Sequence, residues 1–399
     1  MRLRMLFVGL MLALVIALPL AGAPASAEDK IVLGIMGDFT GPTAAGESLA
    51  YGRRDYVNWI NSKGGVAGHK IQDIFIDGKG TAQTELPVFK QMVERGAVAI
   101  LMWSTSGGLA MRDLVNKLHK IPVMMPGQSM ELVDPVNYPY MFILGPTYED
   151  QIKILLDYAK ATGVKTVAFL NDDTGFGKSG IDNIMKMKYA ECIGLTVVGR
   201  IEFPSQAPDL TTEMARLKSL DPDFAYFHGP ITPAIRIAQA SHAVGVRTLR
   251  AGYFGTAVPA MAGLGAAAEK WTAPRLYVDF AGDAPVLREI AEYEKVREVP
   301  AKHKIMNYVQ GWTEARVMVE GIRRAVEKNG GKIPTPIATF RQMVRDEIHG
   351  LKNFDLAGAT AQIVDYANHQ GNGKARLVQD KGGNFADITG YEAPKGKCQ

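Results

Sequence analysis

Apolar runs, each long enough for one buried strand, alternate strictly with segments of helical periodicity along most of this chain. In the first part the apolar runs lie at Ile31–Gly37, Ile71–Asp77, 97–103 and Val123–Met125, and an amphipathic segment such as 83–94 separates each from the next. Strands that alternate with helices form a parallel sheet that helices cover on both faces. The pattern therefore predicts an α/β fold.

The same alternation begins again after an extended segment at 140–145. Further strands are predicted at 167–170, 195–199, Phe224–His228 and 248–253, and later segments predict helices at 305–326 and 337–348 and a hairpin that turns at 381–383. We expect two Rossmann-like lobes with parallel sheets, joined by three hinge crossings near residues 144, 277 and 364. The first lobe would hold 28–143 and 280–363, and the second would hold 144–279 and 364–399. A cleft between hinged lobes is a natural ligand site.

The first 27 residues have the pattern of an export signal. A basic start (MRLR) precedes an apolar run at 5–20, and the small residues ASA occupy 25–27. The apolar run is short for a membrane anchor, so we expect a cleaved signal peptide and a periplasmic protein. Removal of Arg2 and Arg4 leaves 43 of the 45 basic residues against 41 acidic ones, which gives no support for nucleic acid binding.

The residue types that hold metals or cofactors are sparse. The seven His residues are scattered, so we expect no metal and no cofactor. Cys192 and Cys398 are the only cysteines, and export permits a disulfide, but the sequence leaves their pairing open.

Two small polar loops follow neighbouring strands of the first series. Residues 104–108 (STSGG) follow the strand at 97–103, and 126–129 (PGQS) follow Val123–Met125. Carboxyl ends of parallel strands meet at one edge of the sheet, where open α/β folds bind ligands, and free N–H groups at a helix start suit an anion. The alternative is that the serines only cap the following helix. The predicted ligand contacts in these loops are Ser104, Thr105, Ser106, Gly127, Gln128 and Ser129.

Catalytic and nucleotide motifs are weak or missing. GFGKSG at 175–180 matches the dinucleotide pattern G-x-G-x-x-G, but Asp172 and Asp173 would place carboxylates where phosphates bind, which favours a plain glycine turn. Ser106 has no neighbouring His in the sequence, although a distant one such as His228 leaves a hydrolase open. The aromatic residues Trp103, Tyr253 and Tyr277 are equally consistent with ligand contact and with core packing.

Three motifs together resemble the periplasmic branched-chain amino acid binding proteins, the leucine-binding-protein-like type I substrate-binding proteins of ABC importers. They are DFTGP at 38–42, the helix end NSKGGVAG at 61–68 and NDDTGFG at 171–177, and the likeness extends over the mature chain to HQG at 369–371. The resemblance implies two lobes with three hinge strands, closure on a small ligand, and delivery to a membrane permease without chemistry.

In that family a serine at the loop that matches Ser106, together with the loop that matches 127–129, holds the ligand carboxylate. An aromatic residue in the Asp-Asp loop covers the ligand, and Phe176 fits this position. The chain also departs from the family. Tyr253 or Phe254 stands where the family has the acid that binds the ligand ammonium group, Ala45 and Pro230 replace aromatic residues, and Trp103 replaces a smaller one.

These departures predict a ligand that keeps the carboxylate but lacks the α-amino group, because a buried ammonium group without a carboxylate partner is costly. An aliphatic or aromatic acid would satisfy this, with Trp103 and Phe176 stacking on it. Asp172 or Asp173 could supply the missing acid, which leaves an amino acid open. We expect a solute-binding protein and not an enzyme. The alternatives are an exported α/β hydrolase and a ligand-sensing receptor domain of the same fold.

Overall fold

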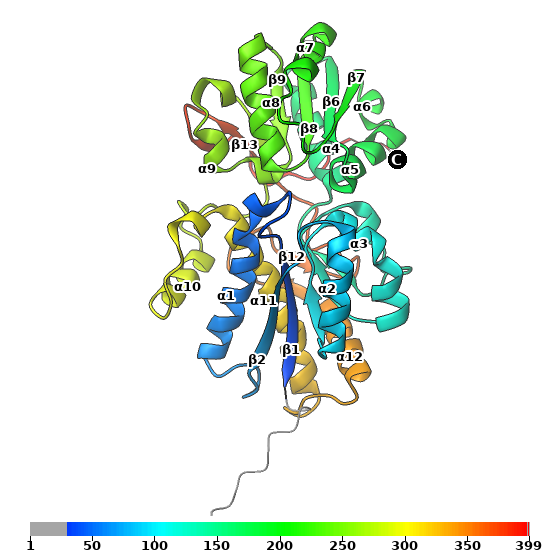
Figure 1. Ribbon diagram of the computed structural model, residues 1–399, viewed down its shortest axis with the longest axis vertical. Coiled ribbons are helices and arrows are strands. Elements are labelled where there is room, and N and C mark those ends of the chain that lie inside the picture. Colours follow the sequence, from blue (N-terminus) through cyan, green and yellow to red (C-terminus); the bar gives the residue numbers. More distant parts are fainter. Residues whose placement is uncertain (1–29, 397, 399) are drawn as a thin grey trace, which may run out of the picture.

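The computed structural model describes residues 30–396 and 398, and it has two α/β lobes stacked along its long axis (Figure 1). The predicted signal peptide, residues 1–27, lies outside the described residues. None of the helices in the described part of the chain combines the length and the apolar character that crossing a membrane requires.

The first lobe is built on a wholly parallel sheet of order β2-β1-β3-β4-β5. Six of the seven residues of β1 are buried, because helices cover both faces of the sheet. The predicted bounds of β1, β2 and β4 are confirmed, whereas the strand predicted at 97–103 is shorter. The strands are β1 (Ile31–Gly37), β2 (Ile71–Asp77), β3 (Ala99–Leu101), β4 (Val123–Met125) and β5 (Met141–Ile143).

The main helices of the first lobe come from two separate parts of the chain. They are α1 (Ser48–Ser62), α2 (Ala82–Glu94), α3 (Thr105–Ala110), α10 (Pro285–Glu294), α11 (Met306–Lys328) and α12 (Ile337–His349). Helices α1 and α11 pack closely because each presents a glycine to the backbone of the other: a Cβ at Gly52 would overlap the Tyr308 carbonyl oxygen, and one at Gly311 the Leu49 carbonyl oxygen. A π-helical segment, Leu114–His119, follows α3 and leaves Leu118 67% exposed.

The second lobe contains a sheet of order β14-β13-β10-β9-β8-β6-β7. Strands β6 to β10 are parallel, and β13 and β14 form the predicted antiparallel hairpin at one edge. The strands are β6 (Thr166–Asp172), β7 (Thr196–Phe203), β8 (Phe224–His228), β9 (Leu249–Gly252), β10 (Thr272–Arg275), β13 (Arg376–Asp380) and β14 (Phe385–Asp387). The helices are α4 (Tyr148–Ala161), α5 (Gly175–Met187), α6 (Tyr189–Cys192), α7 (Thr211–Leu220), α8 (Ile231–Val244) and α9 (Pro259–Ala262).

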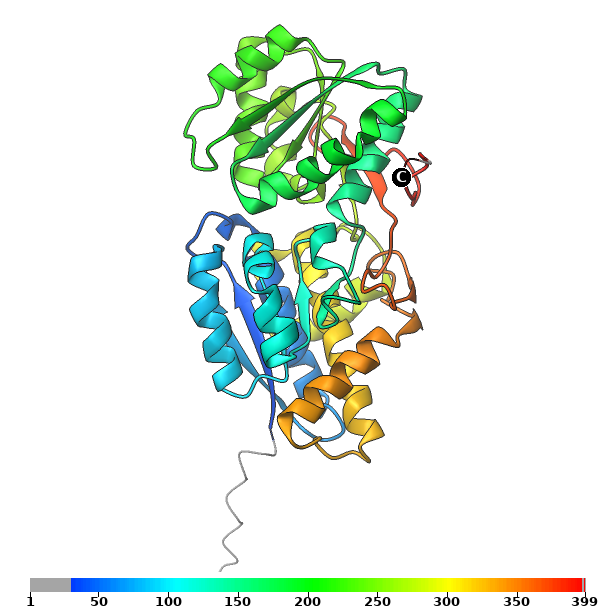
Figure 2. The same ribbon diagram turned by 90° about the vertical axis from the view of Figure 1, so that its right-hand side faces the viewer.

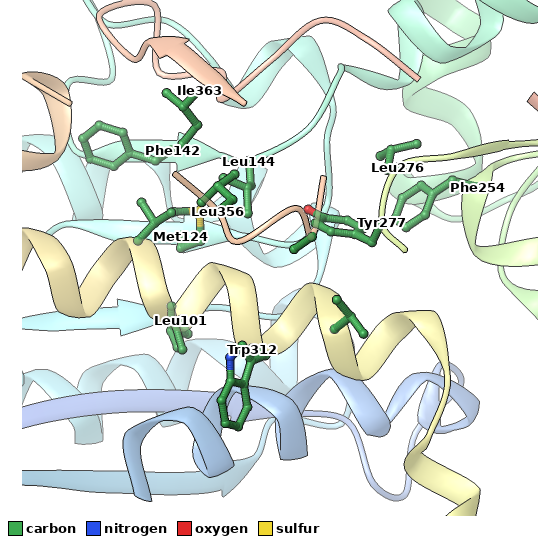
Figure 3. Packing of buried hydrophobic residues seen from close by; sticks show 14 of the residues in the cluster. Leu101, Met124, Phe142, Leu144, Phe254, Leu276, Tyr277, Trp312, Leu356 and Ile363 are labelled. Carbon is green, nitrogen blue, oxygen red and sulfur yellow. The ribbon is translucent and has the colours of Figure 1, made fainter. Parts of the chain in front are cut away.

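The chain passes between the lobes after β5, after β10 and after β12 (Ile363–Asp365), which pairs with β11 (Lys352–Phe354). Ile143 and Gln370 form a parallel bridge, so the first and third passages run side by side. Figure 3 shows Leu144, Leu276 and Tyr277 from these passages packed between Phe142 of the first lobe and Phe254 of the second. The exact lobe boundaries and hinge positions stay a prediction.

A disulfide joins Cys192 and Cys398 across 206 residues of sequence. It attaches the C-terminal tail to the end of α6, and Figure 2 shows this tail, in red, against the second lobe. The Asp157 carboxylate accepts a hydrogen bond from the Lys395 N–H at 2.6 Å and holds the same tail. The pairing that the sequence left open is therefore formed.

Candidate functional site

The loop after β3 presents Ser106 at the carboxyl edge of the first sheet. Ser104 is the N-cap of α3, and its hydroxyl oxygen accepts the Gly107 N–H at 2.9 Å. Ser106 has no such capping role: its Oγ lies 3.4 Å from Ser104 Oγ, and its side chain is partly exposed. The capping alternative thus describes Ser104, whereas the expected contact of Ser106 with a ligand stays a prediction.

A buried carboxyl group supports this loop from below. Glu85, in the first turn of α2, accepts the Ser104 N–H at 3.0 Å through Oε1 and is fully buried. Burial raises the pKa of Glu85 to about 8, so this group is mainly a neutral acid at pH 7. No sequence motif points to Glu85, because its partner lies 19 residues away on another element.

The loop after β4 turns its polar side chains inward. Gln128 and Ser129 are fully buried. The Gln128 side-chain oxygen accepts a hydrogen bond from Gln151 Nε2 at 2.9 Å, and its main-chain carbonyl accepts the Tyr148 N–H at 2.8 Å. Ser129 is the N-cap of the 3-10 turn Met130–Leu132. In this conformation these side chains bind α4 and their own loop, and their expected contact with a ligand stays a prediction.

Four aromatic side chains form a cluster on the facing edge of the second sheet. Tyr148 begins α4, Phe176 lies in the first turn of α5, His228 ends β8 and Tyr253 follows β9. Every pair among the four has ring centroids between 4.5 and 6.5 Å apart. Sequence reasoning found Phe176 and Tyr253 but not Tyr148, and it considered His228 only as a catalytic base. We call these four residues the aromatic cluster.

His228 is neutral within the aromatic cluster. Burial lowers the pKa of His228 to about 3, and Nδ1 lies 2.8 Å from Tyr226 Oη. Its Nε2 has no hydrogen-bond partner among residues 30–396. Neither ring nitrogen of His228 bonds to a serine in the described residues, because Nδ1 bonds to Tyr226 of the same strand and Nε2 has no partner. A Ser–His catalytic pair is therefore not formed there.

Asp172 serves the first turn of α5. Its Oδ1 accepts the Thr174 N–H at 3.0 Å and the Thr174 hydroxyl, and Thr174 caps the helix by accepting the Gly177 N–H. A carboxylate thus occupies the turn where a nucleotide phosphate would bind, as the sequence predicted. Oδ2 of this fully buried carboxyl has no partner within the described part of the chain, and burial raises its pKa.

Trp103 and Tyr277 complete the set of predicted contacts. The Trp103 indole N–H donates to Thr43 Oγ1 at 2.8 Å, and the Thr43 hydroxyl donates to the Asp38 carboxylate at 2.7 Å. This chain of hydrogen bonds fixes the indole at the upper edge of the first lobe. Tyr277 is fully buried in the second passage between the lobes, with its ring centroid 6.4 Å from that of Phe254.

The two edges meet at Ser106 and Tyr148. A Cβ placed on Gly175 would lie 3.4 Å from Ser106 Cβ, and the Tyr148 hydroxyl lies 3.1 Å from the Thr105 hydroxyl across the boundary. The buried Glu149 carboxylate joins the same edges, since it accepts the Met130 N–H at 3.1 Å and the Asn183 side-chain amide at 2.8 Å. The structure thus brings the serine loop against the Phe176 loop, with the aromatic cluster beside them.

Two α/β lobes whose sheets turn their loop-bearing edges toward each other define a two-lobed ligand-binding protein. The model of the periplasmic binding protein family matches residues 30–384, so the chain belongs to that family. It is a substrate-binding protein rather than an enzyme, and the hydrolase alternative is wrong.

Individual relatives agree with this assignment. The chain is 23% identical over 313 residues to "Leu/Ile/Val-binding protein homolog 3" of Brucella melitensis biotype 1, which covers 76% of this chain and 82% of that protein. The fold is similar to that of a branched-chain amino acid ABC transporter protein from Thermus thermophilus with bound valine (25% identity, TM-score 0.83, 91% and 96% coverage). It is also similar to that of a fatty acid ABC transporter substrate-binding protein from Thermomonospora curvata (16%, 0.77, 91% and 92%), a likeness of fold alone.

Proposed function

We propose that this protein is the periplasmic solute-binding component of an ABC importer, and that it binds a small carboxylate between its lobes and delivers it to a membrane permease. Residues 1–27 would export it. The observation that carries the ligand class is the partly exposed Ser106, whose Cβ lies against the Phe176 loop where the carboxyl edges of both sheets meet. The Leu/Ile/Val-binding protein homolog and the Thermus thermophilus protein with bound valine, both named above, support a ligand with an apolar body and a carboxylate.

The proposed ligand lacks an α-amino group. The aromatic cluster carries no carboxylate, and burial keeps its one histidine neutral, so it offers an ammonium group no counter-charge. Asp172 Oδ1 is committed to the first turn of α5 through Thr174; its Oδ2 has no partner among the described residues, but burial raises the pKa of this carboxyl group and so disfavours its charged form. A branched aliphatic or aromatic acid would place its carboxylate at Ser106 and its apolar body against Phe176, Tyr253 and Trp103.

Closure would follow from a shift in population. A ligand that touches both lobes only in the closed state favours that state by its differential affinity. The passages near residues 144, 277 and 364 would act as hinges.

Calorimetry with leucine and with its deaminated keto acid, 4-methyl-2-oxopentanoate, tests the ligand class. We expect the keto acid to bind at least about tenfold more tightly, because leucine would bury an unpaired ammonium group. Clearly tighter binding of leucine would defeat the proposal for the ligand class. A thermal-shift screen of amino acids, keto acids, aromatic acids and fatty acids would then identify the class that binds.

A further inference from the structure

The carboxyl group of Glu85 lies directly below the loop that carries Ser106. Its Oε1 accepts the Ser104 N–H, while its Oε2 has no hydrogen-bond partner within residues 30–396. The residue is 0% exposed, so water does not solvate the second oxygen. One oxygen thus holds the serine loop in place, and the other is buried without a partner.

Gly107 makes this close approach possible. A Cβ at Gly107 would overlap Glu85 Oε2 and would also lie 3.0 Å from Ser104 Oγ. Any other residue at 107 would push the carboxyl away from the helix start. Gly107 therefore allows the Glu85 carboxyl group to lie beside Ser104. Ser104 Oγ in turn lies 3.4 Å from Ser106 Oγ, so the side chain of Ser104 separates the acid from Ser106.

The charges around Glu85 do not favour its ionised form. The negative charge of Asp38, in the loop after β1, raises the pKa of Glu85, while the positive charge of Arg53 of α1 lowers it. The Arg53 guanidinium is already committed to Glu314 of α11, with Nη2 at 2.6 Å from the carboxylate. Glu85 is thus a buried acid, and Arg53, the cation that would favour its ionised form, is already paired with another carboxylate.

We infer that Glu85 couples ligand binding to one proton: it must be protonated for a ligand carboxylate to bind at Ser106, and its ionisation expels that ligand. The inference rests on the proposed function. Two carboxylates that share one desolvated site cannot both ionise cheaply, so a bound carboxylate favours the protonated form of Glu85. By linkage, proton loss from Glu85 weakens carboxylate binding by the same factor. Glu85 acts as a positioning residue through Ser104 and does not itself grip the ligand.

Calorimetry with 4-methyl-2-oxopentanoate in two buffers of different ionisation enthalpy tests the coupling. Between about pH 8 and about pH 10 we expect the parent protein to take up a proton on binding, and its affinity to fall by about tenfold per pH unit. Glu85→Gln, which mimics the neutral acid, should show neither effect. Glu94→Gln is the matched control, because Glu94 lies exposed at the other end of α2, and it should behave as the parent does.

The outcomes separate the two proposals. Binding without proton uptake in the parent, or uptake that persists in Glu85→Gln, overturns the role of Glu85 and leaves the proposed function standing. Failure of every carboxylate to bind overturns both. The parent measurement requires no variant, so a folding defect in Glu85→Gln would not obscure the result.

Discussion

Arg53 of α1 and Glu314 of α11 form an ion pair below the loops of the candidate site, and its removal should be costly. Arg53 donates to Glu314 Oε2 from Nε at 2.9 Å and from Nη2 at 2.6 Å, and both side chains are 0% exposed. Arg53 Nη1 also donates to the carbonyls of Met102 at 2.6 Å and Met36 at 3.3 Å. These carbonyls lie just ahead of the Trp103 and Asp38 loops, so the pair fixes the floor of the site.

Replacement of Glu314 by Gln leaves the guanidinium buried without a counter-charge. Burial already lowers the pKa of Arg53 against the opposing pull of Glu314, so desolvation of this group is expensive. Removal of one partner of a buried pair costs about 3–5 kcal/mol of unfolding free energy. Urea unfolding followed by circular dichroism at pH 7 measures the loss, and ligand affinity should fall with it because both loops lose support.

An exposed ion pair provides the matched control. Arg288 and Asp283 are 2.7 Å apart, but their side chains are 64% and 92% exposed, so Asp283→Asn should cost less than about 1 kcal/mol. The double variant Arg53→Met/Glu314→Leu removes both charges and should lose less stability than Glu314→Gln alone. Equal losses for Glu314→Gln and Asp283→Asn would refute the reasoning from burial.

Three further predictions concern the site edge, the tail and the pH dependence of stability. Ser106→Ala should weaken carboxylate binding by about tenfold to a hundredfold with unchanged circular dichroism, and binding equal to that of the parent would show that the anion site is misplaced. Because the disulfide closes a long loop, Cys192→Ser/Cys398→Ser should lower the unfolding free energy by about 2–5 kcal/mol under oxidising conditions, and a negligible change would contradict this. Burial raises the pKa of Glu149 to about 7, so its folded form keeps a proton that the unfolded chain releases above about pH 4.5. The stability from this group is present below about pH 4.5 and is lost as the pH rises to 7. The unfolding free energy of Glu149→Gln, measured by urea titration, should therefore rise by up to about 3 kcal/mol relative to that of the parent across this range. Parallel pH profiles of the two proteins would contradict the assignment.

The sequence determined the α/β alternation and the place of the ligand loops, because both follow from local patterns. A strand buried on both faces must be apolar along its length, as Ile31–Gly37 is, and the small polar residues of the ligand loops follow directly after such strands in the sequence. The serine loop at 104–106 and the glycine start of α5 were therefore visible before any contact between them was known. Strand β10 was missed because it is only four residues long. Helix α10 was missed although its buried residues Val286, Ile290 and Tyr293 keep helical spacing, so the sequence did contain the signal for it.

Only the tertiary structure decided which side chains face the site and which support it. Glu85 meets Ser104, and Tyr148 reaches Thr105, through the packing of separate elements, and no spacing along the chain records such contacts. Gln128 follows a strand exactly as a ligand residue would, yet α4 packs on its loop and takes its side chain inward. Contacts between residues far apart in sequence depend on how the helices pack on the sheets. The side chains that surround the site are therefore brought together only when both lobes are folded and in contact.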